Sequence, residues 1–204
     1  TCFDSAMCYH NHAIIGDCFK AHPNHNLQLI TKFNGPELNQ YGSVAAIVEQ
    51  ILKETRQDHI DTLLIHNPKV RSHKKTFGEM IELKQHGLIS HIGVSNFTQT
   101  HLEAMGTLTK EIEVNQVEFH PLLNQKALLQ YCQSKAIELF AYRPFAWGKL
   151  EHSSTLKNIA KELKISAYTL SLLWLKNQHI RCAFSTHNPI HLADNLKHLD
   201  LSLP

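Results

Sequence analysis

The chain has 204 residues, of which 43% are hydrophobic and 19% are charged, and its formal net charge is +2. This length and composition allow one sizeable hydrophobic core, which argues against an intrinsically disordered protein and predicts a single domain over residues 1–204. The sequence has neither the basic stripe of a nucleic-acid-binding protein nor an apolar run long enough to cross a membrane.

Seven short apolar runs predict β-strands, at residues 2–6, 27–33, 61–66, 91–95, 113–118, 137–142 and 180–185. Short, mostly apolar strands are typical of a parallel sheet that is covered on both faces. Between them, apolar residues recur at helical spacing over 44–52, 156–163 and 192–199, the last of which ends at Leu199. Ser43 is a candidate N-cap for the first of these helices. Residues 170–175 are apolar nearly all round and predict a deeply packed helix.

The alternation of strands and helices predicts an α/β protein with right-handed crossovers. Two architectures have this pattern: the (β/α)8 TIM barrel and the doubly wound sheet. A doubly wound sheet usually has a glycine-rich phosphate loop after its first strand, and this sequence contains no GxGxxG motif. The TIM barrel is therefore favoured.

Four titratable residues lie at or near the downstream ends of the first three predicted strands: Asp4, Tyr9, Lys32 and His66. In a parallel α/β barrel these strand ends converge on the face that carries the active site. An acid, a phenol, an amine and an imidazole that meet there can move a proton at neutral pH. Each residue alone also has an ordinary explanation, as a helix cap, a packed aromatic, a surface charge or a core histidine.

Six ordered motifs make the set more specific: Phe3-Asp4-Ser5-Ala6 with Tyr9, Ile30-Thr31-Lys32, Leu63-Leu64-Ile65-His66, Ile92-Gly93-Val94-Ser95-Asn96-Phe97, Val114-Asn115-Gln116-Val117-Glu118 and Ala141-Tyr142-Arg143-Pro144. Their order and spacing, which continue to Asn188-Pro189 and Asn195-Leu196, resemble the aldo-keto reductase family. Within that family, the small bacterial 2,5-diketogluconate and methylglyoxal reductases are the most similar group. The resemblance implies a TIM barrel of aldo-keto reductase type.

The resemblance also implies an NAD(P)H-dependent oxidoreductase that reduces aldehydes or ketones, such as small dicarbonyls and keto-sugars, to alcohols. In this family Tyr9 would be the general acid, and His66 would donate a hydrogen bond to the substrate oxygen. A free phenol has a pKa of about 10, and a nearby cation such as Lys32 lowers that pKa. Asp4 would hold Lys32 in place. The alternative is an inactive or truncated nucleotide-binding remnant of the same family.

Further residues match family positions that bind the cofactor. Ser95, Asn96 and Gln116 would bind the nicotinamide carboxamide, and Tyr142 would stack on the nicotinamide ring. Ser95-Asn96 could instead start a helix before Thr98, and Gln116 could satisfy a buried backbone group.

The family usually places Lys and Arg near the adenosine 2′-phosphate, close to the last strand. Here those positions hold Ser185, Thr186 and His191, while Asn195 is kept. NADPH is the expected cofactor, and NADH remains an alternative because no permanent cation is present.

Three other departures concern the site. His10-Asn11-His12 stands where the family commonly has small-Asn-Glu, and Asn67 replaces a common Trp, which opens or polarises one wall of the substrate pocket. Arg143 replaces a small residue, either to attract an anionic substrate group or to form a surface salt bridge. His10 and His12, with His22 and His25, lack a Cys or carboxylate set at a recognised metal-ligand spacing, so no metal site is expected.

The remaining expectations concern the cellular location and the ends of the chain. Five cysteines without a CxxC pair indicate reduced thiols, and the sequence does not open with a secretion signal. We therefore expect a cytoplasmic protein. The chain resembles strands 2 to 8 of the barrel, apparently without the first β/α unit and the C-terminal loop. We expect a small-molecule carbonyl substrate, no nucleic acid or membrane partner, and a monomer if the chain is complete.

Overall fold

A computed structural model describes residues 1–197 and 201. The chain forms two compact units: unit 1 comprises Thr1–Asn115 and Tyr131–Glu138, and unit 2 comprises Gln116–Gln130 and Leu139–Pro204. Among the described residues, no helix is both long and apolar enough to cross a bilayer.

Unit 1 is built on four parallel strands: β1 (Cys2–Asp4), β2 (Gln28–Phe33), β3 (Ile60–Ile65) and β4 (Ile89–Ser95). Each strand pairs with the next one in the chain. The structure therefore confirms the first four predicted strands, although β1 stops at Asp4 because the backbone turns into a 3-10 helix, η1 (Met7–Tyr9). β5 (Val114–Glu118) begins in unit 1 and continues into unit 2.

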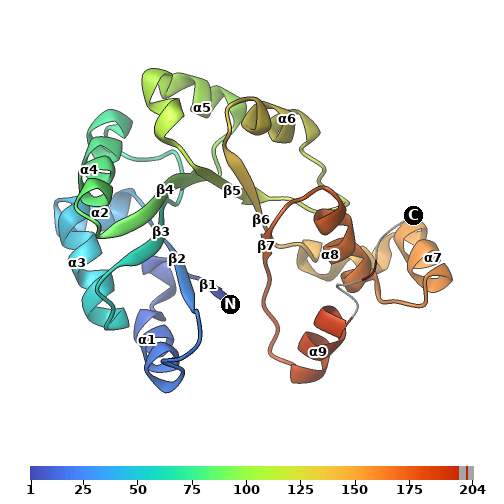
Figure 1. Ribbon diagram of the computed structural model, residues 1–204. Coiled ribbons are helices and arrows are strands. Elements are labelled where there is room, and N and C mark those ends of the chain that lie inside the picture. The colour runs from blue at the N-terminus through green and yellow to red at the C-terminus, as the bar shows by residue number, and fades with distance from the viewer. Residues whose placement is uncertain (198–200, 202–204) are drawn as a thin grey trace. The chain divides into compact units, whose positions relative to one another are not determined.

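Helices follow these strands, and Figure 1 shows α1, α3 and α4 along one face of the sheet. The helices of unit 1 are α1 (His12–Ala21), α2 (Gly35–Tyr41), α3 (Val44–Thr55), α4 (His73–Gln85), α5 (Gln99–Ala104) and the 3-10 helix η2 (Gly106–Glu111). The predicted N-cap of α3 is confirmed, since Oγ of Ser43 accepts a hydrogen bond of 3.2 Å from the Ala46 amide. Val44, Ile47 and Ile51 place the apolar face of α3 in the core.

One glycine allows β4 and β5 to approach closely at the start of β5. A Cβ atom on Gly93 would overlap the carbonyl oxygen of Val114 and lie 3.0 Å from a methyl group of Leu64. Glycine is therefore required at position 93, because any side chain there would clash with the backbone of β5.

Unit 2 contains the parallel strands β6 (Glu138–Tyr142, whose first residue belongs to unit 1) and β7 (Cys182–Ala183). α6 (Lys126–Ser134) is divided between the units, and η3 (Ala146–His152), α7 (Ser154–Glu162), α8 (Ala167–Asn177) and α9 (Pro189–Lys197) follow. The prediction of a deeply packed helix is confirmed by α8, in which Leu170, Leu172, Leu173 and Leu175 are buried. The predicted helix over 192–199 corresponds to α9, and Leu199 lies outside the described residues.

Candidate active site

The strand register of unit 1 aligns three of the predicted site residues. Asp4 is the last residue of β1 and lies opposite Ile30, two residues before Lys32 on β2. Lys32 in turn lies opposite Leu64, two residues before His66, which directly follows β3. Because side chains alternate between the faces of a strand, a step of two residues keeps the side chain on the same face. Neighbouring strands thus present Asp4, Lys32 and His66 at one edge of the sheet.

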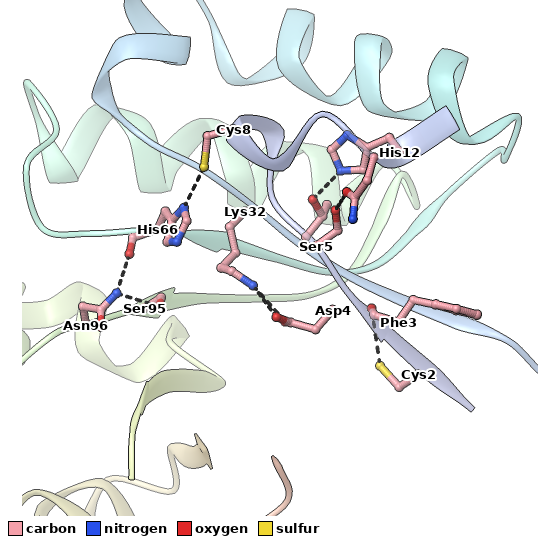
Figure 2. A network of polar contacts seen from close by, with 12 residues as sticks. Cys2, Phe3, Asp4, Ser5, Cys8, His12, Lys32, His66, Ser95 and Asn96 are labelled. Atoms are coloured by element: carbon pink, nitrogen blue, oxygen red, sulfur yellow. Dashed lines mark hydrogen bonds and ion pairs between the residues drawn. The ribbon is translucent and has the colours of Figure 1, made fainter. Parts of the chain in front are cut away.

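Asp4 and Lys32 form a buried ion pair. Nζ of Lys32 lies 2.8 Å from Oδ1 and 2.9 Å from Oδ2 of Asp4 (Figure 2), and the exposed fractions of the two side chains are 1% and 19%. Burial lowers the pKa of Lys32, while the charge of Asp4 and its hydrogen bonds oppose that change. A buried charge is tolerated only when it is paired, so Asp4 is what keeps an ammonium group at this place.

Tyr9 lies beside this pair and beside His66. The turn of η1 brings the Tyr9 ring to a centroid distance of 5.8 Å from the His66 ring, with an angle of 84° between the planes. Nζ of Lys32 is 5.7 Å from the centroid of the Tyr9 ring. The Tyr9 residue is 49% exposed, so a small molecule can reach its side chain. The four residues that the sequence singled out are therefore neighbours within unit 1.

The surroundings of His66 keep its imidazole neutral near pH 7. Burial lowers the pKa of His66 most, the Lys32 charge lowers it further, and Asp4 and Glu37 act in the opposite direction. Nδ1 of His66 lies 3.7 Å from Sγ of Cys8, a contact that Figure 2 shows. Burial raises the pKa of the Cys8 thiol, and Glu37 raises it further, so the thiol keeps its proton at neutral pH.

The sequence pattern did not single out Cys8, although it directly precedes Tyr9 in the chain. Its contact with His66 joins residues that are 58 positions apart, and only the folded structure brings them together.

Ser95 and Asn96 lie next to this group, at the end of β4. Nδ2 of Asn96 donates to the carbonyl oxygen of His66 at 3.0 Å and to Oγ of Ser95 at 3.2 Å, as drawn in Figure 2. Asn96 has a φ of 62°, a left-handed conformation that Asn tolerates better than most residues. The alternative role of Ser95-Asn96 as a helix start is wrong, because Thr98 is the N-cap of α5 and accepts from the His101 amide at 3.3 Å.

A buried histidine links α1 to β2 behind the site. Nε2 of His12 lies 2.7 Å from Oγ1 of Thr31, the residue before Lys32, and its Nδ1 lies 3.2 Å from Oε2 of Glu54 on α3. His12 is 1% exposed, and burial lowers its pKa although Glu54 opposes the change. The sequence marked His12 as a departure from the Glu that is common there and as a member of a histidine group without metal-ligand spacing. Its burial and its partners come from the packing of α1 on α3.

The other predicted cofactor residues belong to unit 2. Gln116 is buried on β5, and Tyr142 ends β6. Arg143 has a φ of 52°, and its Nη1 donates to Oε2 of Glu118 at 3.3 Å. Its guanidinium carbon lies 3.9 Å from the centroid of the Trp147 ring and 5.3 Å from that of Tyr142. Of the two explanations for Arg143, the salt bridge is present in the structure.

Of the predicted phosphate-binding residues, Ser185 and Thr186 precede α9, and His191 and Asn195 lie on it. Ser185 and His191 are exposed, and Asn195 is buried. Oγ1 of Thr186 accepts from the Asn188 amide at 3.1 Å, so this hydroxyl already shapes the turn into α9. Within the part of the chain that the structure describes, no three His, Cys, Asp or Glu side chains are close enough together to hold a metal ion.

Comparison with known proteins gives a consistent result. The model of the Aldo/keto reductase family matches residues 1–204. An aldo-keto reductase of Mycolicibacterium paratuberculosis is 32% identical over 205 residues, which cover 98% of this chain and 73% of that protein. The glyoxal reductase of Bacillus subtilis is 36% identical over 176 residues, covering 84% of this chain and 63% of that enzyme.

A solved structure shares the fold. The crystal structure of a Bombyx mori aldo-keto reductase in complex with NADP matches 100% of this chain and 74% of its own length, with a TM-score of 0.85 at 24% sequence identity.

Proposed function

The chain belongs to the aldo/keto reductase family, and we propose that it reduces carbonyl compounds to alcohols with Tyr9 as the proton donor. Members of this family are NAD(P)H-dependent oxidoreductases. The predicted α/β fold of aldo-keto reductase type is confirmed, and the doubly wound alternative is wrong.

The observation that carries the proposal is the Asp4–Lys32 pair beside Tyr9. When the Tyr9 hydroxyl gives its proton to a carbonyl oxygen, negative charge develops on the phenol oxygen. The ammonium of Lys32, whose Nζ lies 5.7 Å from the ring centroid, stabilises that charge without having to move. Asp4 holds the ammonium with two hydrogen bonds, so its position is fixed before the reaction starts.

His66 would orient the carbonyl. The Cys8 thiol keeps its proton and can donate a hydrogen bond to Nδ1 of His66, which leaves Nε2 as the ring nitrogen that carries the hydrogen. A neutral imidazole with hydrogen on Nε2 can donate to the substrate oxygen. Tyr9 and His66 would then contact the same oxygen from two sides, and Cys8 would fix the tautomer of His66.

The residues present fit a nicotinamide cofactor. Such a cofactor, when bound, supplies the hydride that reduces the carbonyl carbon. The Ser95 hydroxyl and the amides of Asn96 and Gln116 have the donors and acceptors that would hold a carboxamide group, and the aromatic ring of Tyr142 would hold the nicotinamide face. Ser185, Thr186 and His191 offer hydrogen-bonding groups to the adenosine end. NADPH is the expected cofactor, with weaker discrimination against NADH than a permanent cation would give.

We would test this function by following NADPH absorbance with methylglyoxal for the natural chain, Tyr9→Phe and the matched control Tyr131→Phe. Loss of general acid catalysis is expected to lower kcat by about 10²-fold or more in Tyr9→Phe only. NADPH should still quench the intrinsic tryptophan fluorescence, to which Trp147 contributes, in all three proteins. Turnover that survives in Tyr9→Phe would remove the acid role from Tyr9. Quenching without turnover in the natural chain would favour the alternative of a nucleotide-binding remnant.

A further inference from the structure

A group of polar side chains borders Tyr9 and His66 in unit 1, and we call Cys8, Asn34, Glu37 and Asn67 the polar rim. Asn34 directly follows the last residue of β2, and Asn67 directly follows His66, so both lie at the strand ends that carry the candidate acid-base residues. Nδ2 of Asn67 donates to Oδ1 of Asn34 at 3.2 Å, which joins the two strand ends.

Other contacts fix the rim in place. Oε2 of Glu37 accepts from the Asn34 amide at 3.1 Å, and its Oε1 lies 3.5 Å from Nδ2 of Asn34. Oδ1 of Asn67 accepts from the Lys69 amide at 2.9 Å, and Cys8 contacts His66. Asn34, Glu37 and Asn67 are half-buried. These side chains are therefore ordered by the protein and still within reach of a small molecule.

Glu37 gives the polar rim a negative charge. Lys32 and Asp4, which lie close to His66 as well, are paired with each other. The effect of Glu37 reaches the reaction centre, since its carboxylate raises the pKa of Cys8 and acts in the raising direction on the pKa of His66. A substrate carboxylate placed beside His66 would meet a like charge, which is unfavourable.

We propose that the polar rim binds a hydroxyl group next to the substrate carbonyl and rejects a carboxylate there, so that neutral hydroxy-carbonyl compounds are the preferred substrates. This inference rests on the proposed reductase function. An amide NH2 has two hydrogens, and the contact with Asn34 uses one of those of Asn67. The other hydrogen and the Glu37 carboxylate offer a donor and an acceptor to one hydroxyl. A purely apolar substrate would make no hydrogen bond with the second Asn67 hydrogen or with the remaining lone pairs of Glu37, and it would displace water from them, which is costly.

The first test compares two isomers, 1-hydroxy-2-butanone and methoxyacetone. Both have an oxygen one carbon from the carbonyl, but only the first has a hydroxyl that can donate. We expect kcat/KM to favour the hydroxy ketone by about tenfold or more in the natural chain. Asn67→Leu should abolish this preference. Asn39→Leu, a change at an exposed position on α2, should keep it.

The second test concerns charge and uses pyruvate. Glu37→Gln removes the negative charge but keeps a side chain that can accept from the Asn34 amide. The ratio of kcat/KM for pyruvate to that for 1-hydroxy-2-butanone should rise several-fold, roughly the effect of one screened charge. An unchanged ratio would contradict the rejection of carboxylates.

A binding measurement separates failure of this inference from failure of the proposed function. The side-chain NH2 signals of Asn34 and Asn67 in NMR spectra should shift when 1-hydroxy-2-butanone is added and stay in place with methoxyacetone. Selective shifts without any turnover would support the rim and contradict the reductase function. Equal turnover of the two isomers, or equal shifts of the amide signals, would overturn the polar rim and leave the reductase function standing.

Discussion

Nζ of Lys32 lies within 2.9 Å of both carboxylate oxygens of Asp4, in a place where almost no part of the lysine reaches solvent. The pair joins the ends of β1 and β2 and fixes a positive charge beside Tyr9. The pair also costs desolvation free energy, because two charges have been removed from water. Each charge is stabilised there only by the other.

The mutual dependence of Asp4 and Lys32 predicts non-additive stability. Asp4→Asn should lower the free energy of unfolding by about 3–5 kcal/mol, since it leaves a buried ammonium without its partner. The double variant Asp4→Asn/Lys32→Met should be more stable than Asp4→Asn alone, as no buried charge remains. Urea denaturation at neutral pH measures both values. Additive losses in the double variant would contradict the coupling.

His12 predicts a loss of stability in mild acid. Burial lowers its pKa in the folded state, whereas a histidine of the unfolded chain has a pKa of about 6.5. Below that pH the unfolded state binds more protons than the folded state, so stability falls as the pH falls from about 7 to about 5. His12→Gln should make the thermal midpoint depend less on pH. His187→Gln, at an exposed position, serves as the control and should melt with the pH dependence of the natural chain.

Two glycines predict opposite effects of the same substitution. Gly93→Ala should lower the free energy of unfolding by about 1–3 kcal/mol or more, because the new methyl group overlaps the Val114 carbonyl. Gly78→Ala, in α4, meets open space and should raise stability by about 0.5–1 kcal/mol through helix propensity. Denaturant midpoints measure both changes in stability. A Gly93→Ala protein as stable as the natural chain would show that β4 and β5 can move apart at little cost in free energy.

The residue at position 191 is expected to influence the preference for NADPH over NADH. His191→Arg should tighten NADPH on the order of tenfold by adding a charge-assisted hydrogen bond to the 2′-phosphate, and it should leave NADH unchanged. Fluorescence titration gives both dissociation constants. His25→Arg adds the same charge in unit 1 and should change neither of them. Equal tightening of NADPH and NADH in His191→Arg would exclude a contact with the 2′-phosphate.

Periodicity and motif order predicted the strands, the packed helix α8 and the grouping of Asp4, Tyr9, Lys32 and His66. These features depend on local patterns and on the rule that parallel strand ends share an edge. The end of the chain was predicted less well. The strand expected over 180–185 has only Cys182–Ala183 in ladder pairing, because the following residues turn toward α9, where Thr186 bonds Asn188.

The contact of Asp4 with Lys32 was predicted, but other contacts between side chains that are distant in sequence were not. The approach of Cys8 to His66 and the link from Asn34 to Asn67 each depend on how a loop is folded after a strand end. For Arg143 the sequence left a salt bridge and an anion site as alternatives, and only the position of Glu118 shows the salt bridge.

The two-residue offset between Asp4, Lys32 and His66 along neighbouring strands has a consequence for how such a chain can change over time. Loops and helices between the strands can gain or lose residues without moving these side chains. Inserting or deleting one residue inside β2 or β3 would instead turn the following side chain to the opposite face of the sheet. Variation in length should therefore be tolerated in the connections and excluded from the last residues of these strands, so that new substrate preferences can arise while the acid-base residues stay in place.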